Sequence, residues 1–408
     1  MRNRKKILML IPELGYGGAE KSLVRVAKHL SGRHEVKVVV FQRQYARGGY
    51  AAIDENHPFQ IVELDRVAEP GMMKRWARRW RLLRSLKSDS AVTISFLTGA
   101  NILNVLSGGP TRNVVSMQGS RKYDPNLGAI SRYLYLWIID PLVCLLSDRA
   151  VMVSKGVACE TGGVLKPVIR GRTMVIPPMI DAHQMANMAC ERSGEKFDNG
   201  NKAPVVVSAG RMSPEKGFDH LIRVFAKVRA VIPEARLVLI GDGPQLDSLM
   251  SLCRSLGLKA AQSEKDIKDA AVLFTGYRKN PVRLFHEARV FVLSSLTEGL
   301  PNVLIEALAS GIPVVANDAP WGARAVLCEQ PDESCKPYVA NKPMRVDYGT
   351  LMPRIDRLQH EEDWVDVLVS ALTESERDRK QAERNQSRMW QFDQNIIGRH
   401  WLRLIDEL

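Results

Sequence analysis

Cysteine is scarce in this sequence, and its spacing excludes two common architectures. The 408 residues contain six cysteines and no CxxC pair. A zinc site needs clustered ligands and a disulfide framework is dense in cysteine, so these scattered residues favour neither. The cysteines are Cys144, Cys159, Cys190, Cys253, Cys328 and Cys335. This usage is typical of a reduced compartment and favours a cytoplasmic protein.

Three other features are missing. The sequence has no low-complexity run, no repeat of fixed period and no DxD-like acidic cluster. The first two absences exclude disordered and repeat proteins, and the third predicts that the protein needs no metal cofactor. The N-terminal run KILMLI follows basic residues, as in a signal peptide, but it is short and meets Pro12 and Glu13. It therefore predicts a buried strand.

A long uninterrupted apolar run is also lacking. The stretch YLYLWIIDPLVCLLSDRAVMV (133–153) is about long enough to cross a bilayer, but Asp140, Pro141, Asp148 and Arg149 interrupt it. A proline breaks a regular helix, so the stretch predicts a buried helix that runs into a strand. Its aromatic side could still add to a membrane-facing surface.

The length and the order of apolar segments predict two α/β domains. A single core rarely exceeds about 250–300 residues. Short apolar strands alternate with helical stretches up to about residue 180, and the same alternation restarts at PVVVSAGR after a polar, turn-rich stretch. This order is typical of parallel sheets covered by helices. We expect a first domain at 1–182, a linker at 183–203 with the boundary near Lys202, a second domain at 204–363, and helices at 364–408 that pack back toward the first.

Positive charge is concentrated in the first half. Residues 1–180 hold 28 Lys and Arg against 13 Asp and Glu, although the whole chain has a net charge of +13. In MMKRWARRWRLLRSLK (72–87), helical spacing places apolar residues on one face with cations beside them. This pattern predicts a helix on anionic lipid. The candidates for membrane contact are Lys74, Arg75, Trp76, Arg78, Arg79, Trp80 and Arg84. A basic helix packed on its own domain is the alternative; nucleic-acid binding is disfavoured because no basic-aromatic motif accompanies the patch.

The second half contains two glycine-rich loops that each follow an apolar strand. GRMSPEKG places Arg211 and Lys216 where a helix begins, and cations beside free backbone amides suit a diphosphate. IGDGP places Gly243 in a second turn, as nucleotide-binding α/β domains often do.

Two glutamates lie in the apolar stretch SLTEGLPNVLIEALASG. Pro301 suits the first helical position, so we expect a helix from Pro301 to about Ala309 that stops at Gly311. Glu298 then precedes the helix, and Glu306 lies one turn beyond Asn302 on the same face. A carboxylate in such surroundings needs polar partners, and ribose or sugar hydroxyls would supply them. The alternative is one capping carboxylate and one glutamate paired with a core arginine.

At these residues the chain resembles the retaining glycosyltransferases of family 4, which have the GT-B fold of two Rossmann-like domains facing a central cleft. The resemblance covers nearly the whole chain and centres on two acids separated by seven residues, Glu298 and Glu306. It implies that Arg211 and Lys216 hold the donor diphosphate, that Glu306 binds ribose and that Glu298, the best-placed candidate catalytic acid, lies beside the transferred sugar. Further donor contacts are implied at Gly17, Gly18, Tyr277, Gly299, Leu300, Pro301 and Asn302.

One position departs from that pattern. Many family members have a histidine after the strand that corresponds to NVVS, whereas this chain has Gln118 and Gly119. These two residues are our acceptor-side candidates. A protein nucleophile is not required, because the departing phosphate can take the acceptor's proton.

Together the residues and the resemblance predict a metal-free, retaining transferase. It would move a sugar from a nucleotide-diphosphate donor to a lipid-linked oligosaccharide of a surface polysaccharide pathway, at the anionic cytoplasmic leaflet. Two alternatives stay open: another sugar-nucleotide enzyme of the same fold, such as an epimerase, and a non-catalytic sugar-binding scaffold.

Overall fold

The computed structural model shows two compact α/β units. It describes residues 4–15, 17–41, 57–65, 71–190, 203–262, 270–330, 340–373 and 379–408. Unit 1 comprises residues up to Lys122, Gly128–Ile180 and Phe392–Leu408, and unit 2 comprises Tyr123–Leu127 and Asp181–Gln391. The expected boundary residue Lys202 lies outside the described residues.

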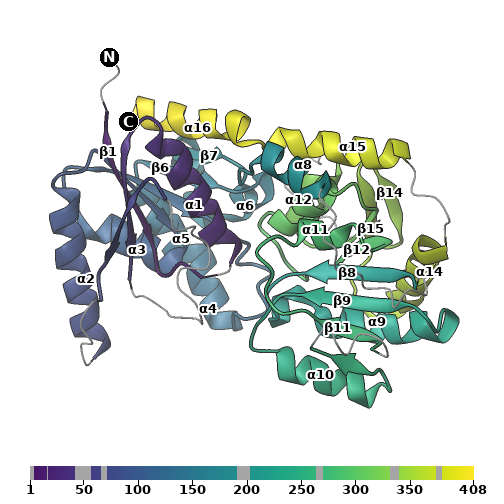
Figure 1. Ribbon diagram of the computed structural model, residues 1–408. Helices are drawn as coiled ribbons and strands as arrows, with labels where there is room; N and C mark the ends of the chain where they lie inside the picture. Colours follow the sequence, from purple (N-terminus) through teal and green to yellow (C-terminus); the bar gives the residue numbers. More distant parts are fainter. Residues whose placement is uncertain are drawn as a thin grey trace. The chain divides into compact units, whose positions relative to one another are not determined.

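Unit 1 is built on a parallel sheet with the order β3-β2-β1-β4-β5-β6-β7 (Figure 1). The described strands are β1 (Lys6–Ile11), β2 (Glu35–Val40), β3 (Gln60–Glu63), β4 (Val92–Phe96), β5 (Arg112–Met117), β6 (Arg149–Met152) and β7 (Thr173–Val175). Strands β1 and β4 are almost wholly buried, because helices pack on both of their faces. The N-terminal run KILMLI is therefore a central strand, as its sequence predicts.

The described part of unit 1 also contains helices, some of which pack on this sheet. They are α1 (Gly18–Ser31), α2 (Met72–Lys87), α3 (Thr98–Ser107), α4 (Ala129–Leu134), the π-helix η1 (Tyr135–Ile139), α5 (Asp140–Leu146), α6 (Lys155–Glu160), η2 (Gly163–Leu165), α7 (Lys166–Ile169), η3 (Arg170–Arg172) and α16 (Gln394–Glu407). Helices α1 and α16 share one cluster, in which the Trp401 ring stacks on Phe96 with centroids 6.1 Å apart.

Unit 2 has a second sheet, in the order β10-β11-β9-β8-β12-β13-β15-β14, in which only the described β14–β15 pair is antiparallel. Its strands are β8 (Val205–Ala209), β9 (Arg236–Ile240), β10 (Ala260–Ala261), β11 (Val272–Phe274), β12 (Val290–Leu293), β13 (Val314–Asn317), β14 (Met344–Val346) and β15 (Gly349–Met352). The doubly wound parallel architecture expected for both halves is confirmed.

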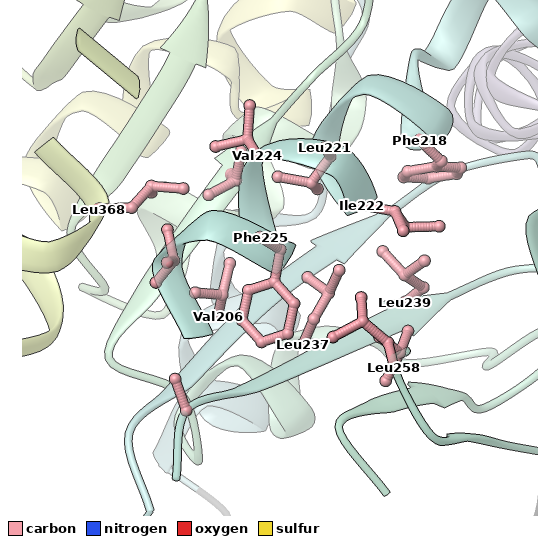
Figure 2. Packing of buried hydrophobic residues seen from close by; sticks show 14 of the residues in the cluster. Val206, Phe218, Leu221, Ile222, Val224, Phe225, Leu237, Leu239, Leu258 and Leu368 are labelled. Atoms are coloured by element: carbon pink, nitrogen blue, oxygen red, sulfur yellow. The ribbon is translucent and has the colours of Figure 1, made fainter. Parts of the chain in front are cut away.

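Helices cover this sheet as well. They are α8 (Ala182–Cys190), η4 (Pro214–Lys216), α9 (Phe218–Val231), α10 (Leu246–Ser255), α11 (Val282–Phe285), α12 (Asn302–Ala309), α13 (Gly322–Leu327), η6 (Leu358–His360), α14 (Glu361–Thr373), α15 (Arg379–Met389) and η7 (Trp390–Phe392). Figure 2 shows the apolar side of α9, including Phe225, gathered over Val206 and Leu237, with Leu368 of α14 beside them. This packing fixes where α9 begins, at the end of the loop that follows β8.

The chain changes units later than its sequence suggests. Helix α14 packs against α9 through Trp364 and Leu368, and α15 packs against α12, so both belong to unit 2. Only the segment from Phe392, with α16, returns to unit 1. Helix α8 occupies part of the expected linker and also belongs to unit 2. The helical composition of 364–408 does not reveal that α14 completes the core of unit 2 or that α15 packs on α12.

The apolar segment 129–146 differs from its expected form. Helices α4, η1 and α5 follow one another without a break from Ala129 to Leu146, and this described segment is long and apolar enough to cross a membrane. Pro141 does not interrupt it, because Pro141 falls in the first turn of α5, directly after the π-helix. Only 22% of the segment is buried, so the expectation of a buried helix is wrong.

Candidate functional site

The loops at one edge of the unit 2 sheet carry the expected donor residues. Because the strands are parallel, their carboxyl ends lie at the same edge. Arg211 and Lys216 follow β8, Gly243 follows β9, Tyr277 follows β11, and Glu298 follows β12. The fold therefore brings these segments, far apart in sequence, to one edge.

The loop after β8 is held against the end of β12. Its last residue before α9, Gly217, has a φ of 63°, which favours glycine. A Cβ added there would lie 2.5 Å from the Ser294 carbonyl oxygen. The Ser294 hydroxyl also donates to the Lys216 carbonyl at 2.8 Å. Lys216 is thus placed by its backbone, and Arg211 on the same loop is exposed.

Lys216 and Glu298 form an ion pair in this structure. The Lys216 Nζ lies 2.6 Å from Glu298 Oε1, and the side chains are 22% and 10% exposed. Such a charge-assisted bond between two strand-end loops is strong and directional. The pairing joins the two motifs that the sequence identified separately.

Helix α12 carries the second glutamate. It begins at Asn302, one residue later than expected, because Pro301 has an extended backbone with ψ of 103°. Gly299, Leu300 and Pro301 are buried in the turn before it. Glu306 is buried, 4% exposed, on this otherwise apolar helix. A buried carboxylate requires polar surroundings, so its position favours a functional or paired role over a solvated one.

The loop after β9 requires a glycine at position 243 because the backbone of the loop after β8 lies against it. A Cβ at Gly243 would lie within 3 Å of the Met212 backbone. The Met212 amide donates to the Asp242 carbonyl at 2.9 Å, so the loops after β8 and β9 are joined backbone to backbone. A similar bond of 2.9 Å runs from Gly241 to Gly276, next to the half-buried Tyr277. These contacts show how the loops are held together, and donor contact at Gly243 and Tyr277 stays a prediction.

The motifs did not identify Trp321. It follows β13, has a φ of 77°, and its backbone is bridged to that of Glu298. A Cβ on the next residue, Gly322, would lie 2.6 Å from the Glu298 Cβ. A left-handed backbone is strained for a tryptophan and is more common at functional sites. The sequence signal that could have identified Trp321 is the tetrapeptide APWG, which follows β13 after one intervening residue.

Glu215 was also missed. Its carboxylate accepts bonds from the Ser213 hydroxyl at 2.5 Å and from the Asn126 side-chain amide at 3.0 Å. Burial opposes ionisation of Glu215, but these hydrogen bonds and Lys216 together lower its pKa. It therefore adds a fixed negative charge next to Lys216.

The remaining sugar-site candidates belong to unit 1. Gly17 precedes α1, which begins at Gly18, and a Cβ at Gly17 would collide with the Glu20 carboxylate. Gln118 and Gly119 follow β5; the Gln118 amide donates to the Ser116 hydroxyl at 2.7 Å, and a Cβ at Gly119 would meet open space. Both loops lie at the carboxyl edge of their sheet.

A buried acid lies behind the Gln118 loop. Asp140 Oδ2 is 3.6 Å from the Arg121 Nε, while its other oxygen has no hydrogen-bond partner among the described residues. Burial raises the pKa of Asp140 to about 6, against the opposing effect of Arg121. Glu160 accepts bonds from the Ser120 hydroxyl at 2.8 Å and the Arg121 amide at 2.7 Å.

Helix α2 packs through much of its expected lipid-facing side. Leu83 is buried, and the Trp76 ring meets Phe41 edge to face at 6.1 Å. Arg79 is buried and paired with Asp65 at 2.5 Å, so it is not available to a phosphate.

Other parts of α2 stay accessible. The Trp80 indole donates to the Leu106 carbonyl at 2.9 Å but is partly exposed. Lys74, Arg81 and Arg84 are exposed, and Arg75 and Arg78 are half-buried. Trp76 and Leu83 thus match the alternative of a helix packed on its own domain, whereas Met73, 85% exposed, does not, and lipid contact by the outer cations stays a prediction.

In the ranges that the structure describes, no group of three His, Cys, Asp or Glu side chains could hold a metal ion. Cys144, Cys253 and Cys328 are free and buried, whereas Cys159 is in a disulfide, which the scattered spacing did not predict.

Comparison with known proteins adds to this geometry. Residues 203–341 match the family described as "Glycosyl transferases group 1". The chain is 29% identical over 250 residues to the uncharacterized glycosyltransferase MJ1059 of Methanocaldococcus jannaschii, spanning 58% of each protein. It is 28% identical over 307 residues to the lipopolysaccharide core biosynthesis glycosyltransferase LpsE of Rhizobium meliloti, covering 74% of this chain and 75% of LpsE.

Solved structures agree at the level of fold. The crystal structure of Anabaena HepE in complex with UDP and glucose superposes with a TM-score of 0.75 at 18% identity, covering 99% of this chain and 100% of that one. Residues 203–341, which match the glycosyl transferases group 1 family, contain strands β8 to β13 and with them the strand-edge loops described above. The chain therefore has the GT-B fold, and its residues 203–341 match the glycosyl transferases group 1 family.

Proposed function

We propose that the protein is a retaining glycosyltransferase that moves a sugar from a nucleotide-diphosphate donor to a membrane-anchored acceptor. The observation that carries this proposal is the joining of Lys216 and Glu298, with Glu306 on the following helix, at one sheet edge of a glycosyl transferases group 1 domain. Binding of UDP and glucose by HepE, a protein of the same fold, supports a nucleotide-sugar donor.

The donor diphosphate would meet positive charge at the start of α9. Arg211 and Lys216 lie on the loop before this 14-residue helix, whose first amides point toward the same end. Glu306 would accept hydrogen bonds from the ribose diol, and Glu298 would face the transferred sugar. Cations and amides would neutralise the diphosphate without a metal.

The Lys216–Glu298 pair gives this arrangement a second property. The two opposite charges pair with each other, which holds the lysine in one place. A bound diphosphate would share the lysine with Glu298. A cation that is already positioned loses little entropy when its ligand arrives.

The transfer would proceed with the following balance. The bond between the anomeric carbon and the phosphate oxygen breaks, and the acceptor hydroxyl oxygen bonds to that carbon on the same face. The hydroxyl proton passes to the departing phosphate. Arg211 and Lys216 would stabilise the negative charge that develops there, which is the largest contribution expected from the protein.

The acceptor is proposed to be a lipid-linked oligosaccharide of a surface polysaccharide, met at the cytoplasmic face of the membrane. The role of LpsE in lipopolysaccharide core biosynthesis supports this class, as does the surplus of cations in residues 1–180. The enzyme would bind that membrane peripherally.

Release of nucleoside diphosphate tests the proposal. The purified protein, supplied with nucleotide sugars beginning with UDP-glucose, should release the diphosphate only when a glycolipid acceptor is added. The anomeric configuration of the product, read by NMR, should equal that of the donor. Conversion of the donor sugar without an acceptor would instead indicate an epimerase-like enzyme, and donor binding without turnover would indicate a sugar-binding scaffold.

A further inference from the structure

The helical segment Ala129–Leu146 presents an apolar surface to solvent. The segment consists of α4, η1 and α5, which follow β5 and precede β6 in the chain of unit 1; Figure 1 labels α4 and α5. Its exposed large residues are Ile130, Tyr133, Leu134, Trp137, Ile138, Leu142 and Leu146. The rings of Tyr133 and Trp137 stack on each other with centroids 6.3 Å apart. Contiguous exposed apolar residues in a folded protein mark an interaction site.

The inner side of the same segment is firmly packed. Asp140, Pro141, Val143 and Cys144 are buried, and α5 packs against α3 and α7. The acid in the segment therefore points into unit 1, so no carboxylate of this segment is exposed on the apolar face. The segment is too closely built into the sheet domain to leave it and span a bilayer.

Cations border this apolar face. Arg132 lies within the segment, and the adjoining α7 and η3 bring the exposed Lys166, Arg170 and Arg172. The Arg172 guanidinium donates to the Leu145 and Ser147 carbonyls at 2.9 Å, which joins that cationic group to the end of α5. Val168, 61% exposed, extends the apolar face between Lys166 and Arg170.

We propose that this face inserts into the headgroup region of an anionic bilayer and is the main membrane-binding surface of the protein. Aromatic rings with an apolar body and a polar edge are favoured at the membrane interface, and flanking Lys and Arg suit anionic headgroups. A second copy of the chain fits less well, because a self-complementary contact would bring the like-charged borders together. The proposal deepens the proposed function, on whose membrane-anchored acceptor it rests.

This surface differs from α2 in the expected response to salt. Attraction of exposed cations to lipid is screened at high ionic strength, whereas burial of apolar side chains is not. Binding through 129–146 should therefore persist in high salt, where a purely electrostatic contact would be lost.

Co-sedimentation with phosphatidylethanolamine–phosphatidylglycerol vesicles tests the proposal. Replacing Tyr133, Trp137 and Ile138 together by Ser should weaken partitioning by about tenfold or more, since three apolar side chains leave the lipid. A matched control replaces Leu106, Val231 and Leu358, which are exposed elsewhere, by Ser, and should bind as the parent does. Equal thermal unfolding of both variants shows that the fold is kept. Parent-like binding of the first variant, or no binding by the parent, would overturn the proposal.

A conservative variant provides an independent readout. Trp137→Phe should keep vesicle binding but lose part of the tryptophan quenching caused by brominated lipid. Unchanged quenching would place Trp137 outside the bilayer and contradict the proposal. A parent that is dimeric without lipid, together with a monomeric triple variant, would show that the face is instead an interface between copies.

Nucleotide binding separates this proposal from the transferase activity. The triple Ser variant should bind UDP as the parent does. If vesicle binding follows the prediction but no donor or acceptor is ever used, the transferase proposal fails alone. If turnover on a soluble acceptor is normal and the triple variant still binds vesicles, the membrane surface proposal fails alone.

Discussion

In unit 2 the charged residues that are candidates for donor binding lie at one sheet edge, whereas in unit 1 the candidate membrane contacts are divided between α2 and the helical segment 129–146. In unit 2, Lys216 and Glu298 come from different loops and meet at 2.6 Å. In unit 1, α2 turns Trp76 and Leu83 inward and leaves Lys74, Arg81 and Arg84 exposed, while the segment 129–146 turns its acid inward and leaves Tyr133 and Trp137 exposed. Two helices that each combine tryptophan and arginine thus have opposite orientations, because what surrounds each helix decides which face is covered.

The largest effect should come from removing the charges of the unit 2 edge. Lys216→Ala and Glu306→Ala should each lower turnover on the order of a hundredfold or more, as removal of one key electrostatic group typically does. Lys227→Ala is the control, since Lys227 pairs with Glu361 at 2.7 Å away from the edge. Diphosphate-release kinetics provide the measurement. Near-parent turnover in either variant, with its fold intact, would remove that residue from the donor site.

Arg79, a buried cation of α2, should matter more for stability than the exposed cations of this helix. Arg79→Gln breaks the close pair with Asp65 and should lower the free energy of unfolding by roughly 2–3 kcal/mol, because the acid is left with little solvent. Arg81→Gln, an exposed change on the same helix, should shift it by less than about 0.5 kcal/mol. Urea unfolding compares them, and equal midpoints would mean that α2 is not held by this pair.

Asp140 should make the stability of unit 1 depend on pH. Its pKa is raised by burial to about 6, so between about pH 4 and 6 the folded state binds more protons than the unfolded state. Stability therefore falls as pH rises through this range. At pH 7.5, Asp140→Asn should stabilise the protein by about 1 kcal/mol. The substitution removes the cost of burying a charged carboxylate, and this gain exceeds the loss of the ion pair with Arg121. Melting curves should show that this advantage disappears near pH 4.5, and an advantage at both pH values would contradict the role of ionisation.

The exposed cations of α2 should have a smaller, salt-dependent effect on vesicle binding. Replacing Lys74 and Arg81 by Gln should weaken binding to anionic vesicles about fivefold at low ionic strength and hardly at all at high ionic strength. Vesicle co-sedimentation over a salt series measures this. A loss as great as that of the triple Ser variant would reverse the proposed ranking of the two helices.

The smallest effect should follow removal of metal. Arg211, Lys216 and the α9 amides are expected to meet the donor charge, so EDTA should leave turnover unchanged within about twofold. Loss of activity that magnesium or manganese restores would contradict this expectation.

The sequence predicts unit 2 better than unit 1 for a physical reason. A loop between a buried strand and a helix places its residues locally, so β8, α9 and α12 with their charged residues follow from short motifs. The pairing of Trp321 with Glu298, and the return of only α16 to unit 1, depend on which elements meet in three dimensions. The same limit applies to α2 and 129–146, whose periodicity fits an outward or an inward apolar face equally well.

The π-helix Tyr135–Ile139 sets the rotational phase of the apolar face. In a regular helix, at about 100° per residue, Leu142 and Leu146 would lie about 120° and 160° around the axis from Ile130. The wider π-turn, in which the Asp140 amide donates to the Tyr135 carbonyl, turns the following residues back by about the angle of one residue. The one additional residue in this turn thus keeps the exposed apolar residues of α4 and those of α5 on the same side of the segment. Deleting one residue there would rotate α5 relative to α4 while leaving the composition almost unchanged.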